Sequence, residues 1–379
     1  FGYYIETNKT KDNGAGIGDM ANNETAELDN DGRLVFKPRT SATDTHKAVR
    51  TYNRNDNSWT VYTGAEGDVA PTYDNPVLNI ISCTYIGNVF GGGWGTGAKL
   101  YADPTVNINM IPGEYASQID RDGNDSPDND ADALGEIGNV YGGGNAAEVI
   151  GNTTVNIATE PTVTLTTGTD HDPKTVLGAY ITGNVFGAGK GKHDNVETAL
   201  VRGNANVNMA GGTVKGNIYG GGELSSVGDF TFASGKVTGS NDNTTGKTTG
   251  KATVTISGGT IGDESEYVYD ANNTIEHTNG GNVFAGGKGS LYQTGSTTAV
   301  IANWPEFAKV KETVLNISGD NTRIMSNAYG GAEIGSVGYE NGTNIVGATD
   351  INITGGTFGT EIMDGTTTKY TFGSVFGGL

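Results

Sequence analysis

A short glycine-rich signature that returns seven times limits what this chain can fold into. Its clearest form is Gly-Asn-Val-Phe-Gly-Gly-Gly at residues 87–93. A single repeat of this kind cannot bury its own apolar face, so the copies must stack on one another to make a core. The aromatic residues that mark the seven copies are Phe90, Tyr141, Phe186, Tyr219, Phe284, Tyr329 and Phe376.

A second recurring segment has the alternation of a β-strand. Thr-Val-Asn-Ile occurs at residues 105–108 and 154–157, with varied forms at 253–261, 314–319 and 350–358. Val and Ile two residues apart point to one side of a strand, while the Asn or Thr between them points to the other. No helix fits between these strands. The two segments together predict an all-β fold, a parallel β-helix (solenoid) with projecting loops.

The spacing of the aromatic residues separates this architecture from its alternative, a β-propeller with glycine-rich blades. The gaps range from 33 residues, between positions 186 and 219, to 65 residues, between positions 219 and 284. Propeller blades repeat evenly and hold four strands each, and these gaps do not. A coil of a parallel β-helix takes about 20–30 residues. We therefore expect one to three coils per gap, with loops projecting at 110–136, 223–251 and 262–279.

Residues 1–76 differ from the rest of the chain in carrying more charge and a Tyr/Trp alternation at residues 58–62. We expect them to form a flanking β-rich segment or irregular first coils, and residues 77–379 to form the β-helix repeat region of a longer protein. One helix is predicted at residues 303–312, with Asn303 as its N-cap and Pro305 in its first turn. It would be a small insertion outside the solenoid body.

Composition narrows the classes of partner. The 62 glycines against 9 prolines suit short strands separated by turns. A formal net charge of −20 would repel a phosphate backbone, so nucleic acid is not an expected partner. Cys83 is the single cysteine, which leaves no partner for an intrachain disulfide. No apolar run is long enough to span a membrane, so we expect no membrane insertion in this segment.

The densest cluster of candidate metal ligands lies in residues 120–132. Alternate carboxylates there could converge as oxygen ligands on Ca²⁺. The segment resembles the loops of thrombospondin-type calcium repeats, and it departs from an EF-hand in lacking Gly at the sixth position and Glu at the twelfth. Such a run can also be a solvated acidic loop. The expected calcium ligands are Asp120, Asp122, Asn124, Asp128, Asp130 and Asp132, and no other cofactor is expected.

The seven signature aromatic residues have two interpretations. Facing outward, a row of rings would be a platform on which sugar rings stack. Facing inward, the same row would be a ladder in the core. Recurring apolar residues in a repeat normally form its interior, which favours the core ladder.

Catalysis by a β-helix lyase or hydrolase needs clustered carboxylates beside a group that transfers protons. The four histidines all lie in polar, loop-like contexts, and three glutamates follow glycine-rich signatures as parts of the repeat. We therefore predict no catalytic residue and no enzymatic activity. The alternative is a carbohydrate-active β-helix enzyme, namely a polysaccharide lyase, a hydrolase or a phage-type depolymerase. The residues concerned are His46, His171, His193 and His277, and Glu148, Glu223 and Glu333.

The alternating Gly-Asn-Val-Phe/Tyr-Gly-Gly-Gly and Val-Asn-Ile-Ser/Thr-Gly-Gly-Thr-Ile segments resemble those of very large repetitive secreted or surface proteins of Gram-negative gut bacteria. These proteins are similar to adhesins with right-handed parallel β-helix folds. The resemblance covers roughly residues 78–379. It implies an extracellular or cell-surface structural or adhesive function, as part of a fibre or in binding surface glycans, proteins or other copies of the same protein. It transfers no catalytic residue.

Overall fold

The computed structural model divides the chain into two compact units, residues 1–74 and 75–379. In the first unit it describes four strands, β1 (Glu24–Leu28), β2 (Leu34–Pro38), β3 (Ala48–Asn53) and β4 (Ser58–Tyr62), which pair in chain order as an antiparallel sheet. In the second unit it describes residues 75–113, 133–165, 171–242, 248–341, 343–364 and 366–378.

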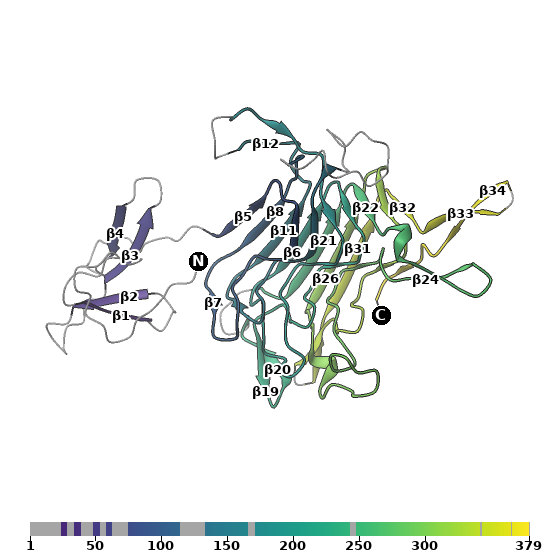
Figure 1. Cartoon of the computed structure of the whole chain (residues 1–379). Helices are drawn as coiled ribbons and strands as arrows, with labels where there is room; N and C mark the ends of the chain where they lie inside the picture. Colours follow the sequence, from purple (N-terminus) through teal and green to yellow (C-terminus); the bar gives the residue numbers. More distant parts are fainter. Residues whose placement is uncertain are drawn as a thin grey trace. The chain divides into compact units, whose positions relative to one another are not determined.

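The second unit is a parallel β-helix of seven coils, as the repeat predicts (Figure 1). One side of every coil is a strand of a seven-stranded sheet whose members pair in parallel, each with the equivalent strand of the next coil. These strands are β5 (Val77–Ile80), β8 (Thr105–Ile108), β11 (Thr153–Ile157), β16 (Ala205–Met209), β21 (Lys251–Ile256), β26 (Glu312–Ile317) and β31 (Ala348–Ile353).

The glycine-rich signature forms the second side of each coil, a sheet of twelve strands that is also parallel. In the two coils nearest the N-terminus this side is one strand, and in the later coils a turn or an inserted hairpin divides it into two short strands. The strands are β6 (Tyr85–Phe90), β9 (Glu136–Tyr141), β14 (Tyr180–Ile181), β15 (Val185–Phe186), β17 (Thr213–Val214), β18 (Ile218–Tyr219), β22 (Gly259–Ile261), β25 (Val283–Phe284), β27 (Thr322–Ile324), β28 (Ala328–Tyr329), β32 (Thr357–Phe358) and β35 (Val375–Phe376).

The core follows the alternation of the strands. In β16 the side chains of Ala205, Val207 and Met209 are buried and the asparagines between them are partly exposed. Stacking of equivalent Val and Ile side chains makes one cluster that runs between the two sheets from coil to coil. A third side, which begins with β7 (Lys99–Leu100) and β10 (Glu148–Val149), continues as a column of single valines packed on small alanines. Its later members are Val201, Val227, Val310 and Val337.

The Gly-Asn pair of the signature has a separate role at a corner of the coil. From Asn139 onward, the side-chain oxygen of the asparagine accepts a hydrogen bond from the backbone N–H of its counterpart in the next coil, as from Asn184 to Asn139 (2.9 Å) and from Asn217 to Asn184 (2.8 Å). The following glycines allow coils to approach closely, because a Cβ at Gly142 would lie 2.2 Å from the carbonyl oxygen of Gly187. These contacts explain why the Gly and Asn residues of the signature recur at equivalent positions in successive coils.

The structure decides two points that the sequence left open and corrects one expectation. Blades of a propeller are ruled out, because the strands pair in parallel between coils. Each gap between aromatic residues holds a single coil, since Tyr219 pairs directly with Phe284 across the longest gap. The helix predicted at 303–312 is only a 3₁₀ turn at Trp304–Glu306, with Asn303 in the left-handed conformation and no side-chain cap. The residues after this turn reach the valine column at Val310, where cross-coil pairing outweighs local helix preference.

The extra residues in the long gaps fold into antiparallel hairpins. Segment 223–251 contains β19 (Phe230–Ala233) and β20 (Lys236–Ser240), and segment 262–279 contains a 3₁₀ turn at Glu264–Glu266 followed by β23 (Tyr267–Tyr269) and β24 (Ile275–Thr278). Most of segment 110–136 lies outside the described residues. Further hairpins are β12 (Thr162–Val163) with β13 (Lys174–Thr175), β29 (Tyr339–Asn341) with β30 (Asn344–Val346), and β33 (Thr360–Asp364) with β34 (Thr367–Thr371).

Candidate functional site

The seven signature aromatic rings form one continuous stack along the solenoid. Neighbouring ring centroids lie between 4.6 and 5.1 Å apart, and the planes are within 9° of parallel. Tyr141, Phe186, Tyr219 and Phe284 are buried, Phe90 and Tyr329 are partly buried, and Phe376 in the last coil is exposed. Because each inner ring has a neighbouring ring on both faces, the stack works as a core ladder. It offers no row of open faces to a sugar.

Phenylalanine and tyrosine alternate in this stack, and the buried tyrosine hydroxyls find acidic partners. The hydroxyl of Tyr141 donates to Glu223 Oε2 at 2.7 Å, and the hydroxyl of Tyr219 donates to Glu333. Each bond skips one coil. Burial raises the pKa of both tyrosines, and the neighbouring carboxylate raises it further. The two hydroxyls therefore remain protonated donors at any physiological pH.

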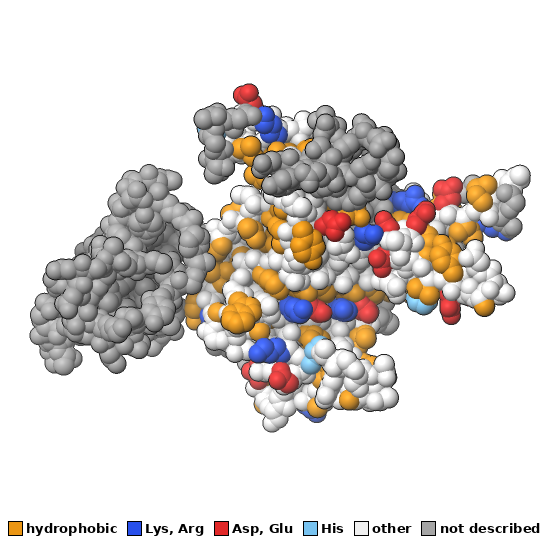
Figure 2. Space-filling model, viewed as in Figure 1, with side chains coloured by type: hydrophobic (Ala, Val, Ile, Leu, Met, Phe, Trp, Pro, Cys, Tyr) orange, Lys and Arg blue, Asp and Glu red, His pale blue; other side chains and the backbone are white. Residues whose placement is uncertain are grey.

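In four successive coils, the position four residues after the aromatic residue forms a column of alternating charge. Lys190, Glu223, Lys288 and Glu333 occupy it in four successive coils, held in register by backbone hydrogen bonds. Glu223 lies 3.8 Å from the ammonium of Lys190 and 3.9 Å from that of Lys288. Figure 2 shows basic and acidic side chains alternating in a row across the solenoid. Glu223 and Glu333, which the sequence predicts to be parts of the scaffold, thus accept hydrogen bonds from the tyrosines, and Glu223 also neutralises the lysines.

Glu148 belongs to a separate charged cluster beside the third side of the coil. It pairs with Lys99 (2.9 Å) and Arg202 (2.5 Å), and Arg202 also lies 3.5 Å from Asp229 and donates to the carbonyl of Phe230. Burial would raise the pKa of Glu148. The hydrogen bonds and charges of Lys99 and Arg202 outweigh that effect and lower the pKa below its ordinary value.

Lys311 fastens the β19–β20 hairpin to the body of the solenoid. Its buried ammonium lies 2.5 Å from Asp242 and donates to Ser240 and Thr249. It also lies 5.4 Å from the ring centroid of Phe230. Burial alone would raise the pKa of Asp242, but the hydrogen bonds from Lys311 and Thr249 lower it. Segment 223–251, which was expected to be a projecting loop, is therefore held against the solenoid body at Lys311.

The six expected calcium ligands all lie outside the described residues. Within the described ranges, no three His, Cys, Asp or Glu side chains are placed to hold a metal ion. His46 also lies outside those ranges, His171 bonds to the carbonyl of Leu165 (2.9 Å), His193 bonds to Thr294 (2.8 Å), and His277 is exposed on β24. Cys83 is half-buried, and burial raises the pKa of its thiol.

Sequence analysis missed two features. The first is the lysine half of the charged column, although Lys190 and Lys288 stand in the sequence where Glu223 and Glu333 do. The second is Arg323 on β27, whose Nε atom is buried without a hydrogen-bond partner. No signal in the sequence distinguishes this arginine, because its surroundings come from three different coils.

The fold defines a class, the parallel β-helical repeat proteins. No helix among the described residues is long and apolar enough to cross a membrane. No protein-family model, curated protein or solved structure matches the chain.

Proposed function

We propose that this chain is an extracellular structural or adhesive repeat protein that binds surface glycans or proteins, or forms part of a fibre with other copies of itself. The observation that carries this proposal is the set of side-chain ladders that run from coil to coil along the solenoid. Aromatic rings, corner asparagines and core aliphatic residues each continue from coil to coil. Such a body is a stiff support for whatever projects from it.

The chemistry of the carboxylates supports the same proposal. Glu148 and Glu223 are paired with lysine or arginine, and Glu333 accepts the hydroxyl of Tyr219. A glycosidase needs two carboxylates facing a substrate, with at least one shifted toward protonation. The pKa of Glu148 is instead lowered by its cationic partners. These residues stabilise the scaffold, as their repetition predicts.

Contacts with a partner are proposed for the projecting hairpins. Several large apolar side chains are exposed there, and scaffold-mounted loops commonly supply binding residues. Extracellular placement follows from the resemblance stated above, and the net charge of −20 suits a soluble surface protein. Calcium binding by residues 120–132 is part of the proposal, because a calcium-rich medium would neutralise that loop.

The test uses the full chain, fluorescently labelled, on a glycan microarray and on fixed bacterial and epithelial cells. We expect saturable binding to at least one surface. In parallel, the unlabelled chain is incubated with pectic, alginate and capsular polysaccharides, and reducing ends and unsaturated products are measured. Time-dependent product formation would replace this proposal with the lyase or hydrolase alternative, and absence of binding to every surface would refute adhesion.

A further inference from the structure

Arg323 stands apart from the other charged groups of the solenoid. It lies in the middle of β27, where it pairs with Thr260 of the preceding coil and Thr357 of the following one. Its flanking neighbours Thr322 and Ile324 are buried, so the arginine side chain lies on the outer side of the sheet. Its Nε atom is nevertheless buried and makes no hydrogen bond within the described part of the chain. Buried donors without a partner are rare in folded proteins, so this arginine needs an explanation.

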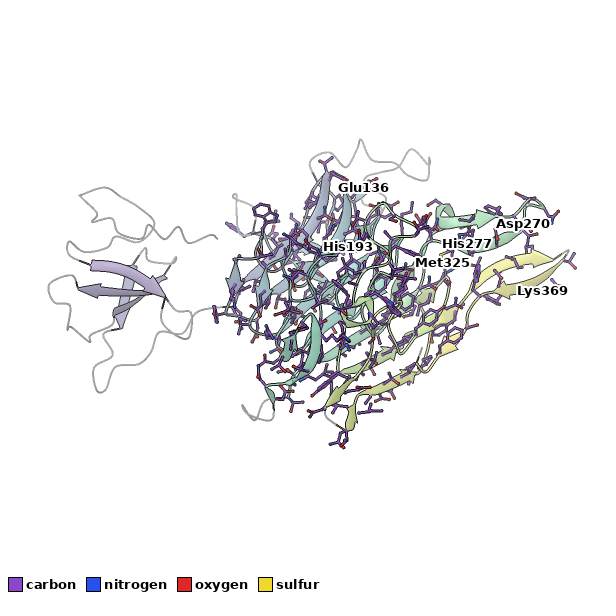
Figure 3. All side chains as sticks on the ribbon, turned by 90° about the horizontal axis from the view of Figure 1, so that it is seen from below. Glu136, His193, Asp270, His277, Met325 and Lys369 are labelled. Carbon is purple, nitrogen blue, oxygen red and sulfur yellow. The ribbon has the colours of Figure 1, made fainter. Side chains whose placement is uncertain are left out.

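Two hairpins leave the solenoid on either side of the coil that contains Arg323. The coil before it carries the β23–β24 hairpin, and the coil after it carries the β33–β34 hairpin. The coil of Arg323 has no hairpin at this position, and its chain continues from β27 through Met325 to β28, between the bases of the two hairpins. Met325 N bonds to the carbonyl of Ile261, and Gly359 N bonds to the carbonyl of Ile324. Figure 3 shows Asp270 and His277 on one hairpin and Lys369 on the other, both projecting on the side where Met325 lies.

Tyrosines of the β23–β24 hairpin lie over this coil. The hydroxyl of Tyr267 is 2.9 Å from Thr360 Oγ1, at the start of the other hairpin, so its ring spans from one hairpin to the other. Burial raises the pKa of Tyr267, and the hydrogen bond with Thr360 and the positive charge of nearby Arg323 oppose this shift without cancelling it. Tyr269 packs edge-to-face on Tyr267, with centroids 6.4 Å apart, and half of it is exposed to solvent. An aromatic surface therefore leads from Arg323 outward.

The charges around this position leave Arg323 without a carboxylate partner. The neighbouring cation Lys215 is paired with Asp263 at 3.5 Å, and Asp263 is engaged further by Ser265. Glu264 lies near enough to raise the pKa of Tyr267, yet no carboxylate of the described residues forms an ion pair with Arg323. Arg202, by contrast, has both Glu148 and Asp229.

We propose that Arg323, with the Tyr267–Tyr269 pair, binds the carboxylate-bearing sugar of an acidic glycan. A guanidinium matches a carboxylate with two parallel hydrogen bonds, and the threonines on either side offer hydroxyls to the sugar. A sugar ring has apolar faces that pack on tyrosine. Arg323 is partly exposed although its Nε is buried, so a carboxylate that reaches the outer nitrogens of its guanidinium would supply the anionic partner that this arginine lacks. This inference rests on the proposed adhesive function and names the ligand class of one site.

The test compares methyl β-glucuronide with methyl β-glucoside, which differ in a carboxylate against a hydroxymethyl group. Binding to the full chain is measured by saturation-transfer NMR titration at low and at physiological salt. We expect the glucuronide to bind at least tenfold more tightly than the glucoside, with the preference weakening as salt rises. Equal binding of the two probes would overturn the inference.

Three variants locate the site, and each is first checked by circular dichroism and thermal melting. R323Q should abolish the preference for the glucuronide, and Tyr269→Ala should weaken binding of this probe about fivefold. R323K keeps the charge and removes the planar fork, so it should retain only part of the preference and serves if R323Q is unstable. Lys236→Gln, on the exposed edge of β20, is the matched control and should change nothing.

These outcomes separate the site from the general function. A chain that binds cell surfaces equally well with and without Arg323, and shows no preference for the glucuronide, refutes this site and leaves adhesion standing. A chain that binds neither cells nor arrayed glycans refutes both. Loss of the glucuronide preference in R323Q, with the Lys236→Gln control intact, supports the assignment.

Discussion

Removing one ring from the centre of the aromatic stack gives the sharpest test of what holds the solenoid together. Phe186 is fully buried, and its ring lies 4.9 Å from that of Tyr141 and 4.8 Å from that of Tyr219. Replacing a buried phenylalanine by alanine costs about 3–5 kcal/mol through lost burial and the cavity left behind. Both faces of this ring are covered, so we expect Phe186→Ala to lower the free energy of unfolding by about 4 kcal/mol.

The matched control is the same substitution at the open end of the stack. Phe376 has 45% of its surface exposed and only one stacked neighbour, Tyr329, at 4.9 Å. Phe376→Ala should therefore cost only about 1 kcal/mol. Both variants leave the backbone and the corner asparagines in place, so the difference between them isolates the burial of the ring.

Urea denaturation followed by far-UV circular dichroism measures both variants. With a slope of about 4 kcal/mol per molar urea for a body of this size, Phe186→Ala should lower the midpoint by about 1 M, and Phe376→Ala by about a quarter of that. An additional unfolding transition at low urea, seen in Phe186→Ala but not in the unmodified chain, would show that some coils unfold independently of the others. Equal midpoints for the two variants would refute the assignment of the stack to the core.

Three further predictions concern the charged and polar partners. Tyr219→Phe removes the donor to Glu333 and should lower stability by about 1–2 kcal/mol in urea denaturation, with no such loss in the double variant that also replaces Glu333 by Gln. The folded-state pKa values of Glu148 and Asp242 are lowered, so the stability they contribute is full above their ordinary pKa values and is lost as pH falls through the folded ones; thermal melting from pH 7 to pH 3 should show this loss, and Glu148→Gln should reduce it. If residues 120–132 bind calcium, millimolar Ca²⁺ should raise the melting temperature more than Mg²⁺ and a chelator should reverse it, whereas equal effects of the two ions would indicate a solvated acidic loop.

The fold was predictable because its signals are local and repeated. Alternation in segments such as 205–209 gives a strand, and the recurrence of the glycine-rich signature gives the stacking. The number of coils per gap was not predictable, since inserted residues and additional coils lengthen a gap in the same way. The interval from Tyr219 to Phe284 is one coil with its extra length in two hairpins.

Contacts between residues that are far apart in the sequence could not be predicted from it. The helix signals at Asn303 and Pro305 are real locally, but they cannot show that Val310 belongs to a valine column built from five other coils. Likewise, 82 residues separate Tyr141 from Glu223, and nothing local indicates that a hydroxyl would reach a carboxylate two coils away. The surroundings of Arg323 have the same origin, because the two hairpins beside it come from other coils.

In the four coils that carry Lys190, Glu223, Lys288 and Glu333, the alternation of Phe with Tyr and of Lys with Glu gives a repeat that is two coils long. Lysine follows phenylalanine at Lys190 and Lys288, and glutamate follows tyrosine at Glu223 and Glu333. The hydroxyls of Tyr141 and Tyr219 bond to the glutamate two coils further on, so each of these buried polar groups meets its acceptor only when both alternations keep the same phase. Lysines between the glutamates place opposite charges in adjacent coils, where identical residues would repel. If the lysines and glutamates of this column exchanged places, the hydroxyls of Tyr141 and Tyr219 would face ammonium groups, which cannot accept their hydrogen bonds, so the matched phase of the two alternations stabilises the stack.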